Sequence, residues 1–237
     1  LVEAAHELRH AWQDERGMAD ADDRLTHDEE MARVFMIEAD ARAFSVGVAW
    51  ELKQAGDPDA WDYVANHSRE YKLTAQRFAD HMDRLTDLGL QDTGASDVAM
   101  KQAMRVGYET WFSHHQNRDY YQEKVNHDQG YDRGVQPGWQ QLNDDFIIQL
   151  GQMPKAGPSK ASSLTSYLNH NDLALARHYA AMTNDPAQGI GTNDHTTIRQ
   201  HLMAEAAAQN QQEAPFEPNN PQPAAVLPPR HTTPRLA

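Results

Sequence analysis

The sequence predicts a mainly α-helical protein, and three observations support that fold class. Apolar residues recur at intervals of three and four along most of the chain, which is the period of an amphipathic helix. No segment alternates apolar and polar residues as a half-buried strand does. Glycine and proline separate the periodic segments, as they do where helices end. Hydrophobic residues make up 39% of the 237 residues, which is enough for a packed core.

Two helices are expected at the start of the chain. The first covers residues 1–16 and stops before Gly17, because glycine is favoured just beyond a helix C-terminus. The second is long and covers about 27–54. Thr26 opens it, because Glu29 follows three residues later and gives the pair the spacing of a capping box.

Shorter periodic segments follow. Residues 68–88 carry an apolar stripe at alternating spacings of four and three, formed by Tyr71, Ala75, Phe78, Met82 and Leu85. Further helices are expected at 59–66, 96–127, 139–150, 172–182 and 194–209.

Composition divides the chain into four parts. Residues 1–152 form the expected helical domain. Residues 153–163 hold prolines, glycine and serines and are typical of a linker. Residues 164–210 form a helical extension. Residues 211–237 are rich in proline, glutamine and asparagine, have few apolar residues, and are expected to be disordered.

The charge and the missing cysteines exclude several classes of partner and site. A net charge of −14 argues against nucleic acid and anionic membranes, since both need basic patches. No apolar run approaches the roughly 20 residues that span a bilayer, so no membrane insertion is expected. The chain has no cysteine, so a metal would be held by histidines and carboxylates. It begins at Leu1, which we interpret as a missing native N-terminus. The chain is expected to be soluble, cytoplasmic or exported, and its compartment and oligomeric state stay open.

The first expected helix contains His6-Glu7-Leu8-Arg9-His10, an HExxH motif. His6 and His10 lie one helical turn apart on the same face, so both imidazoles can reach one Zn²⁺. Glu7 is offset from them. It is positioned to take a proton from a metal-activated water rather than to bind the ion.

A third protein ligand is expected on the second helix. Glu38 lies at the edge of that helix's apolar stripe, where a carboxylate is costly unless it is paired or binds a metal. Glu30 projects toward the same stripe two turns earlier and is the reserve candidate. Asp40 falls on a different face. The alternative for Glu38 is an ion pair with a buried arginine or histidine.

These residues resemble a known class of enzyme. His6, Glu7 and His10, followed by Glu38-Ala39-Asp40-Ala41 on a second helix, look like the gluzincin type of zincin metallopeptidase, and the string is similar to a bacterial metallopeptidase family of unknown substrate. The resemblance covers about the first 55 residues. It implies zinc held by His6, His10 and Glu38, Glu7 as general base, and a peptide or protein substrate.

The resemblance also implies a fold. Zincins usually place a small β-sheet before the motif helix, and only five residues precede His6. We therefore expect a zincin-like helical core with the N-terminal sheet missing, followed by the helical extension and the disordered tail. No motif marks a residue that would stabilise the oxyanion; the available side chains, each also suited to packing or a helix surface, are Tyr108, His114, His115 and Tyr120.

Three functions compete. The leading one is zinc-dependent peptide-bond hydrolysis with Glu7 as the base. The second is a carboxylate-bridged di-iron helical protein, since Glu7-x-x-His10 also has the Glu-x-x-His spacing of that class. The third is a helical interaction module in which the motif has no catalytic role. The acidic loop containing Asp20, Asp22 and Asp23 lacks the spacing of a calcium loop and is expected to be solvated.

Overall fold

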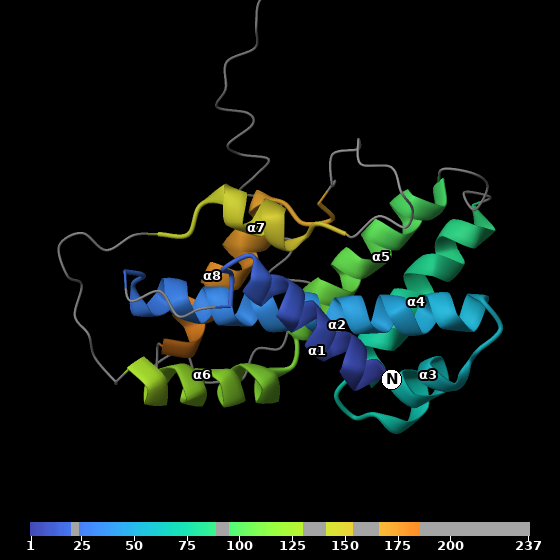
Figure 1. Cartoon of the computed structure of the whole chain (residues 1–237), viewed down its shortest axis with the longest axis horizontal. Coiled ribbons are helices and arrows are strands. Elements are labelled where there is room, and N and C mark those ends of the chain that lie inside the picture. Colours follow the sequence, from blue (N-terminus) through green and yellow to red (C-terminus); the bar gives the residue numbers. More distant parts are fainter. Residues whose placement is uncertain (20–23, 89–94, 130–140, 154–165, 185–237) are drawn as a thin grey trace, which may run out of the picture. The chain divides into compact units, whose positions relative to one another are not determined.

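The computed structural model describes residues 1–19, 24–88, 95–129, 141–153 and 166–184. These residues form eight α-helices, one π-helical turn and no β-strand, so the predicted mainly α fold is confirmed (Figure 1). The elements are α1 (Val2–Glu15), α2 (His27–Gln54), α3 (Asp59–Asp62), η1 (Tyr63–His67), α4 (Lys72–Asp87), α5 (Ala95–Trp111), α6 (His115–Gln129), α7 (Asp144–Leu150) and α8 (His170–Asn184).

The chain divides into two compact units, Leu1–His195 and Thr196–Ala237, and every described residue belongs to the first. Three predicted segments lie wholly outside the described residues: the acidic loop at 20–23, the helix at 194–209 and the tail at 211–237. Of the predicted linker at 153–163, only residue 153 is described. The four predicted domain boundaries stay predictions. Within the described ranges, no helix combines the length and the apolar character that crossing a membrane requires.

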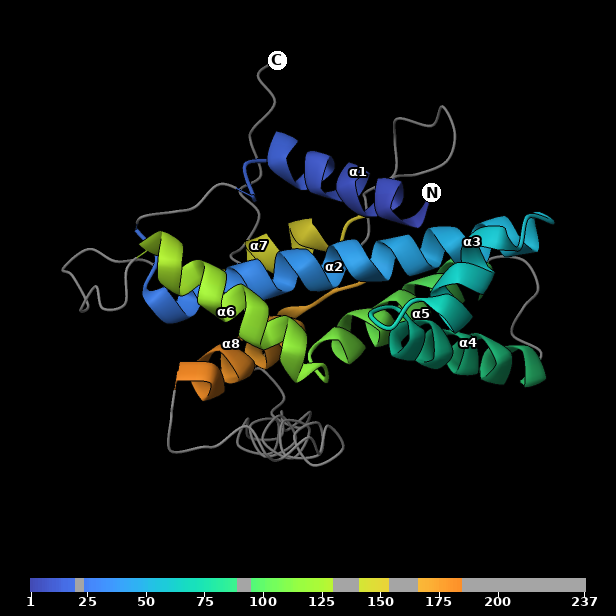
Figure 2. The ribbon, with the colours of Figure 1, turned by 90° about the horizontal axis from the view of Figure 1, so that it is seen from below.

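Helix α2 is the centre of the first unit, because it packs against each of the seven other α-helices. Figure 2 shows α1 along one side of α2, with α4, α5 and α8 along the other. Residues on every side of α2 are consequently buried, including the charged residues Glu30, Arg33, Asp40 and Arg42. A charged side chain that cannot reach water must find a partner. Arg42 donates to the backbone carbonyl of Glu70 at 2.9 Å, and the partners of the other three are described below.

The two predicted caps at the start of the chain are present. Gly17 follows α1 with φ +67°, a left-handed conformation that glycine adopts without strain. The hydroxyl of Thr26 accepts a hydrogen bond from the backbone N–H of Glu29 at 3.3 Å and begins α2. The carboxylate of Glu29 instead accepts bonds from Arg177 at 2.8 Å and from the backbone of Leu142 at 3.0 Å. That carboxylate thus joins α2 to α8 and to the segment before α7.

One predicted helix is wrong in a way that matters for the site. Residues 96–127 do not form one helix: α5 ends at Trp111 and α6 begins at His115. The hydroxyl of Ser113 donates to the carbonyl of Thr110 at 2.8 Å, and the ring of Phe112 stacks on Tyr179 of α8. A serine hydroxyl that bonds to the preceding backbone competes with helix continuation. The break changes the direction of the chain, and α6 packs against α2 (Figure 2).

Two other helices start later than predicted. α4 begins at Lys72 rather than at residue 68, because Ser68 ends the π-helical turn in an extended conformation. α7 begins at Asp144, and the side chain of Asn143 caps it by accepting from the N–H of Phe146 at 3.0 Å. A cap fixes the start of a helix by satisfying an N–H that has no partner inside the helix.

Candidate metal centre

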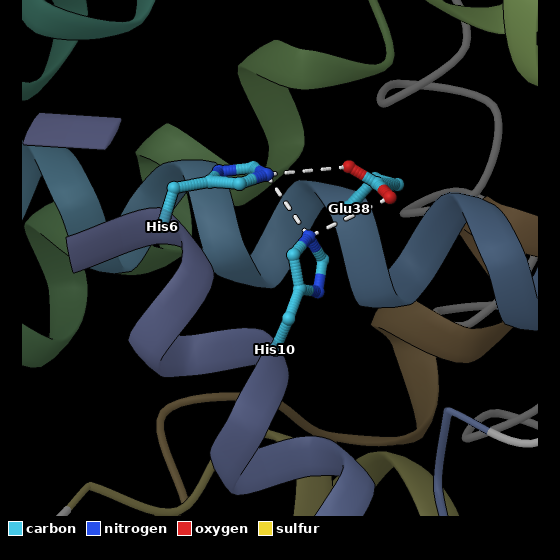
Figure 3. A group of neighbouring side chains, drawn as sticks. All are labelled: His6, His10 and Glu38. Atoms are coloured by element: carbon cyan, nitrogen blue, oxygen red, sulfur yellow. Dashed lines mark hydrogen bonds and ion pairs between the residues drawn. The ribbon is translucent and has the colours of Figure 1, made fainter. Parts of the chain in front are cut away.

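The imidazoles of His6 and His10 lie side by side on α1. Their Nε2 atoms are 2.9 Å apart, and the ring planes are nearly perpendicular. The two residues are four apart in a helix, so their side chains project from the same face. Both Nε2 atoms point toward α2, as Figure 3 shows.

Glu38 of α2 meets the two rings. Its Oε2 lies 3.5 Å from Nε2 of His6 and its Oε1 lies 3.6 Å from Nε2 of His10. Among the described residues, these three side chains form the one group whose ligand atoms, all within 4.8 Å of one another, could hold a metal ion. A tetrahedral ion with bonds of 2.0–2.1 Å has ligand atoms about 3.3 Å apart. The observed separations lie on both sides of that value, so the three donors fit a single small ion.

Helix α1 is held against α2 by Arg9, the fourth residue of the motif. The Arg9 side chain is 1% exposed and forms a two-bond ion pair with Asp40, which is fully buried. Its Nη2 atom also donates to the carbonyls of Leu150 and Gln152 at 2.6 and 3.1 Å. Asp40 further accepts from the phenol of Tyr167. Asp40 therefore makes a second, buried contact between α2 and α1, from a different face of α2 than the one that carries Glu38.

Gln13 connects this buried ion pair to His10. Its Oε1 lies 2.8 Å from Nδ1 of His10, and its Nε2 donates to Asp40 at 2.7 Å and to the carbonyl of Ile37 at 3.1 Å. Partners of this kind behind a metal-binding histidine orient its ring and fix which nitrogen faces the metal. Gln13 was not a sequence candidate, although its spacing of three from His10 on a helix could have identified it.

Tyr71 lies behind His6. The Tyr71 hydroxyl is 3.5 Å from Nδ1 of His6, and it also forms a hydrogen bond with Ser45, whose own hydroxyl donates to the carbonyl of Ala41 at 2.9 Å. Burial raises the pKa of the Tyr71 phenol, and the nearby charge of Arg42 only partly offsets this rise, so the phenol stays protonated. The sequence placed Tyr71 on a buried stripe. A buried tyrosine usually finds a partner for its hydroxyl, which is the signal that could have added it to the site.

Tyr121 of α6 contacts the third member of the cluster, because its hydroxyl donates to Oε2 of Glu38 at 2.6 Å. Burial on its own would raise the pKa of Glu38. The close approach of His10 and His6, the hydrogen bond from Tyr121 and the charge of His10 together outweigh burial and hold that pKa well below its ordinary range. Glu38 is consequently ionised, as a metal ligand must be.

Glu7 directly follows His6 on α1. Its side chain is exposed, and its charge is among the influences that raise the pKa of His10. Burial lowers the pKa of His10, but the hydrogen bond and charge of Glu38 have the larger combined effect. The Glu7 carboxylate is thus accessible to water, whereas His6 is buried and His10 is half-buried.

The structure does not bring the other predicted candidates to the cluster. Glu30, the reserve ligand, forms a buried ion pair with Arg33 at 2.5 Å. The phenol of Tyr108 is fully buried and donates to the backbone carbonyl of Asp172. Tyr120 is 64% exposed, whereas its neighbour Tyr121 faces Glu38.

His114 and His115 are likewise not among the residues that contact the cluster. Burial lowers the pKa of His114, and the charges of Arg42 and Arg77 lower it further, which disfavours a protonated, oxyanion-binding imidazole. His115 is the first residue of α6, at the turn from α5.

Comparison with known proteins adds one positive finding. The model of a family described as Putative metallopeptidase family (DUF6782) matches residues 2–159, which include α1, α2 and the candidate metal centre. No curated protein and no solved structure matches the chain.

Proposed function

The chain belongs to the putative metallopeptidase family whose model covers residues 2–159, and from this premise we propose that it is a gluzincin-like zinc peptidase of the HExxH type. In this proposal His6, His10 and Glu38 hold one Zn²⁺, and Glu7 is the general base. The substrate is a peptide or a protein.

One observation carries the proposal: two imidazole nitrogens and one carboxylate converge from α1 and α2 on a point that a single ion could occupy. Two histidines and a glutamate form a set of three protein ligands that catalytic zinc uses, with a fourth position left for water or substrate. Magnesium and calcium prefer oxygen donors and make poor use of two imidazoles.

Bound zinc would supply Lewis acidity, which polarises a carbonyl and makes water a better nucleophile near neutral pH. The residues of the chain supply the rest. The carboxylate of Glu7, one residue after His6 and exposed, takes a proton from the attacking water and delivers it to the leaving amine. Tyr121 and Gln13 hold Glu38 and His10 in place from behind.

A di-iron centre has less support from the geometry. Such centres are built from several carboxylates contributed by facing helices. The one cluster found within the described ranges contains a single carboxylate, that of Glu38. This donor set favours a mononuclear site.

The experiment is a comparison of the wild-type chain with Glu7→Gln. Both proteins are loaded with zinc, their zinc content is measured, and each is incubated with fluorescently quenched casein. We expect both to retain about one zinc per chain, and only the wild type to cleave. Equal cleavage by Glu7→Gln would remove Glu7 as the base. If the wild type retains zinc but does not cleave casein, the metal site holds and peptidase activity on this substrate is excluded.

A further inference from the structure

We propose that Gln13 is a positioning residue that fixes the tautomer of His10, and that Asp40 in turn fixes the orientation of Gln13. The inference rests on the proposed metal site, because it concerns which nitrogen of His10 is offered to the ion. It adds two residues that lie outside the HExxH motif and outside the group of three ligands.

The orientation of the Gln13 amide is determined by its partners. One end of the amide faces the carboxylate of Asp40 at 2.7 Å and the carbonyl of Ile37 at 3.1 Å. The carbonyl of Ile37 can only accept hydrogen bonds, and both carboxylate oxygens of Asp40 already act as acceptors toward Arg9. The NH₂ group must therefore occupy this end, because a carbonyl oxygen here would face two acceptors at hydrogen-bond distance.

The orientation of the amide determines the proton on His10. With its NH₂ group directed at Asp40 and Ile37, Gln13 presents its carbonyl oxygen to Nδ1 of His10 at 2.8 Å. An oxygen acceptor at that distance requires a proton on Nδ1. In the neutral ring Nε2 then carries the lone pair, and Nε2 is the atom that faces His6 and Glu38 (Figure 3).

Gln13 and Asp40 are held in place because both are buried and each has several hydrogen-bond partners. Gln13 and Asp40 are both 0% exposed. Asp40 accepts hydrogen bonds from Arg9, Gln13 and Tyr167, which come from α1 and from the segment before α8. Rotation of the Gln13 amide would leave a buried donor or acceptor without a hydrogen-bond partner, which is unfavourable. The tautomer of His10 is thus set before any metal binds.

A purely structural Gln13 would need only its two donated bonds, and the state of His10 would not depend on it. The proposal therefore makes a prediction about His10 itself. In the metal-free wild type, above the pH at which His10 is neutral, Nδ1 should carry the proton. Nuclear magnetic resonance of ¹⁵N-labelled imidazoles distinguishes a protonated from an unprotonated ring nitrogen without any activity measurement.

The experiment compares the full-length wild type, Gln13→Met and Tyr71→Phe. Methionine has a similar length and offers no acceptor comparable to an amide oxygen. We expect the Nδ1–H form of His10 in the wild type, a shift toward Nε2–H in Gln13→Met, and a zinc affinity lower by about 10–100-fold in that variant. Tyr71→Phe is the matched control, since it removes the hydroxyl that faces His6 and leaves Gln13 in place. Its His10 tautomer should equal that of the wild type.

Either of two results overturns the proposal: an Nε2–H form of His10 in the wild type, or an unchanged tautomer in folded Gln13→Met. The first needs no variant, so it stands even if Gln13→Met fails to fold. Failure of the proposed function has a different signature. If the wild type shows the expected tautomer but binds no zinc, the role of Gln13 holds and the proposed metal site is wrong.

Discussion

Arg9 and Asp40 form a buried ion pair in which two nitrogens of one guanidinium meet the two oxygens of one carboxylate, at 2.7 and 3.0 Å. Arg9 lies between the glutamate and the second histidine of the HExxH motif, on the face of α1 opposite to solvent. The pair therefore fixes α1 on α2 through a contact next to the one in which His6 and His10 meet Glu38. Its loss should affect both the fold and the candidate metal centre.

Arg9→Met should destabilise the metal-free protein by about 3–5 kcal/mol, because it leaves the Asp40 carboxylate buried without its cation. The double variant Arg9→Met with Asp40→Leu removes both charges and should recover much of that loss. Urea denaturation of the wild type, of Arg9→Met, of Asp40→Leu and of the double variant gives the four free energies of unfolding. A double variant as unstable as the sum of both single variants would show that the two side chains do not interact.

Replacing Glu38 should have a larger effect on zinc than replacing any other buried carboxylate of α2. We expect Glu38→Gln to lower zinc affinity by more than the roughly 10–100-fold typical of a residue behind a ligand. Glu30→Gln is the control, since Glu30 is buried on the same helix but is paired with Arg33. Calorimetric titration of the metal-free proteins with zinc measures both. Equal losses in the two variants would contradict the assignment of Glu38 as a ligand.

Tyr121→Phe should weaken zinc binding by about 10–100-fold, because Glu38 loses the phenol that orients its Oε2. It should also raise the pKa of Glu38, since that hydrogen bond favours the ionised carboxylate. Tyr120→Phe alters the adjacent, exposed phenol and should leave zinc affinity unchanged. Equal zinc affinities in Tyr121→Phe and Tyr120→Phe would contradict the role of the Tyr121 phenol in orienting Glu38.

Zinc affinity should fall as pH falls through the pKa of His10. Despite the opposing effect of burial, the hydrogen bond and charge of Glu38 raise that pKa in the metal-free chain, so the ring takes up a proton at a higher pH than an ordinary histidine. A protonated imidazole cannot bind the ion, and affinity should drop about tenfold per pH unit for each proton that zinc displaces. Glu38 does not contribute in this range, because its pKa is lowered and it stays ionised. Affinity measured from pH 5 to 8 that does not change would contradict this account.

The start of the fold could be predicted from the sequence because its signals are local. Gly17 and Thr26 mark the end of α1 and the start of α2 through their own backbone and side-chain preferences. The break between α5 and α6 could not be predicted in this way. The side chains around it suit a helix, and the packing of Phe112 on Tyr179, 67 positions later, accompanies a change in chain direction.

This break also explains why one site residue was missed. Tyr121 reaches Glu38 from α6, which changes direction after the break and packs against α2. A continuous helix over 96–127 therefore gave no reason to choose Tyr121 over Tyr120. Placing the residues of α2 around its helix axis from the sequence could not show which of its faces is the most deeply buried. It located Glu38 beside the apolar stripe, where Glu38 meets the histidines, but α2 is buried on all sides. Asp40, on a different face, is therefore more deeply buried than Glu38 and fixes the position of α1.

The most direct measurement is the metal content of the purified full-length chain after zinc loading and dialysis, determined by elemental analysis alongside His6→Ala and His10→Ala. We expect about one zinc per wild-type chain and loss of that zinc in both variants, with helical circular dichroism retained. A folded wild type that retains no metal would contradict the proposed zinc site and favour a helical interaction module. Two irons per chain would contradict it in favour of a di-iron protein.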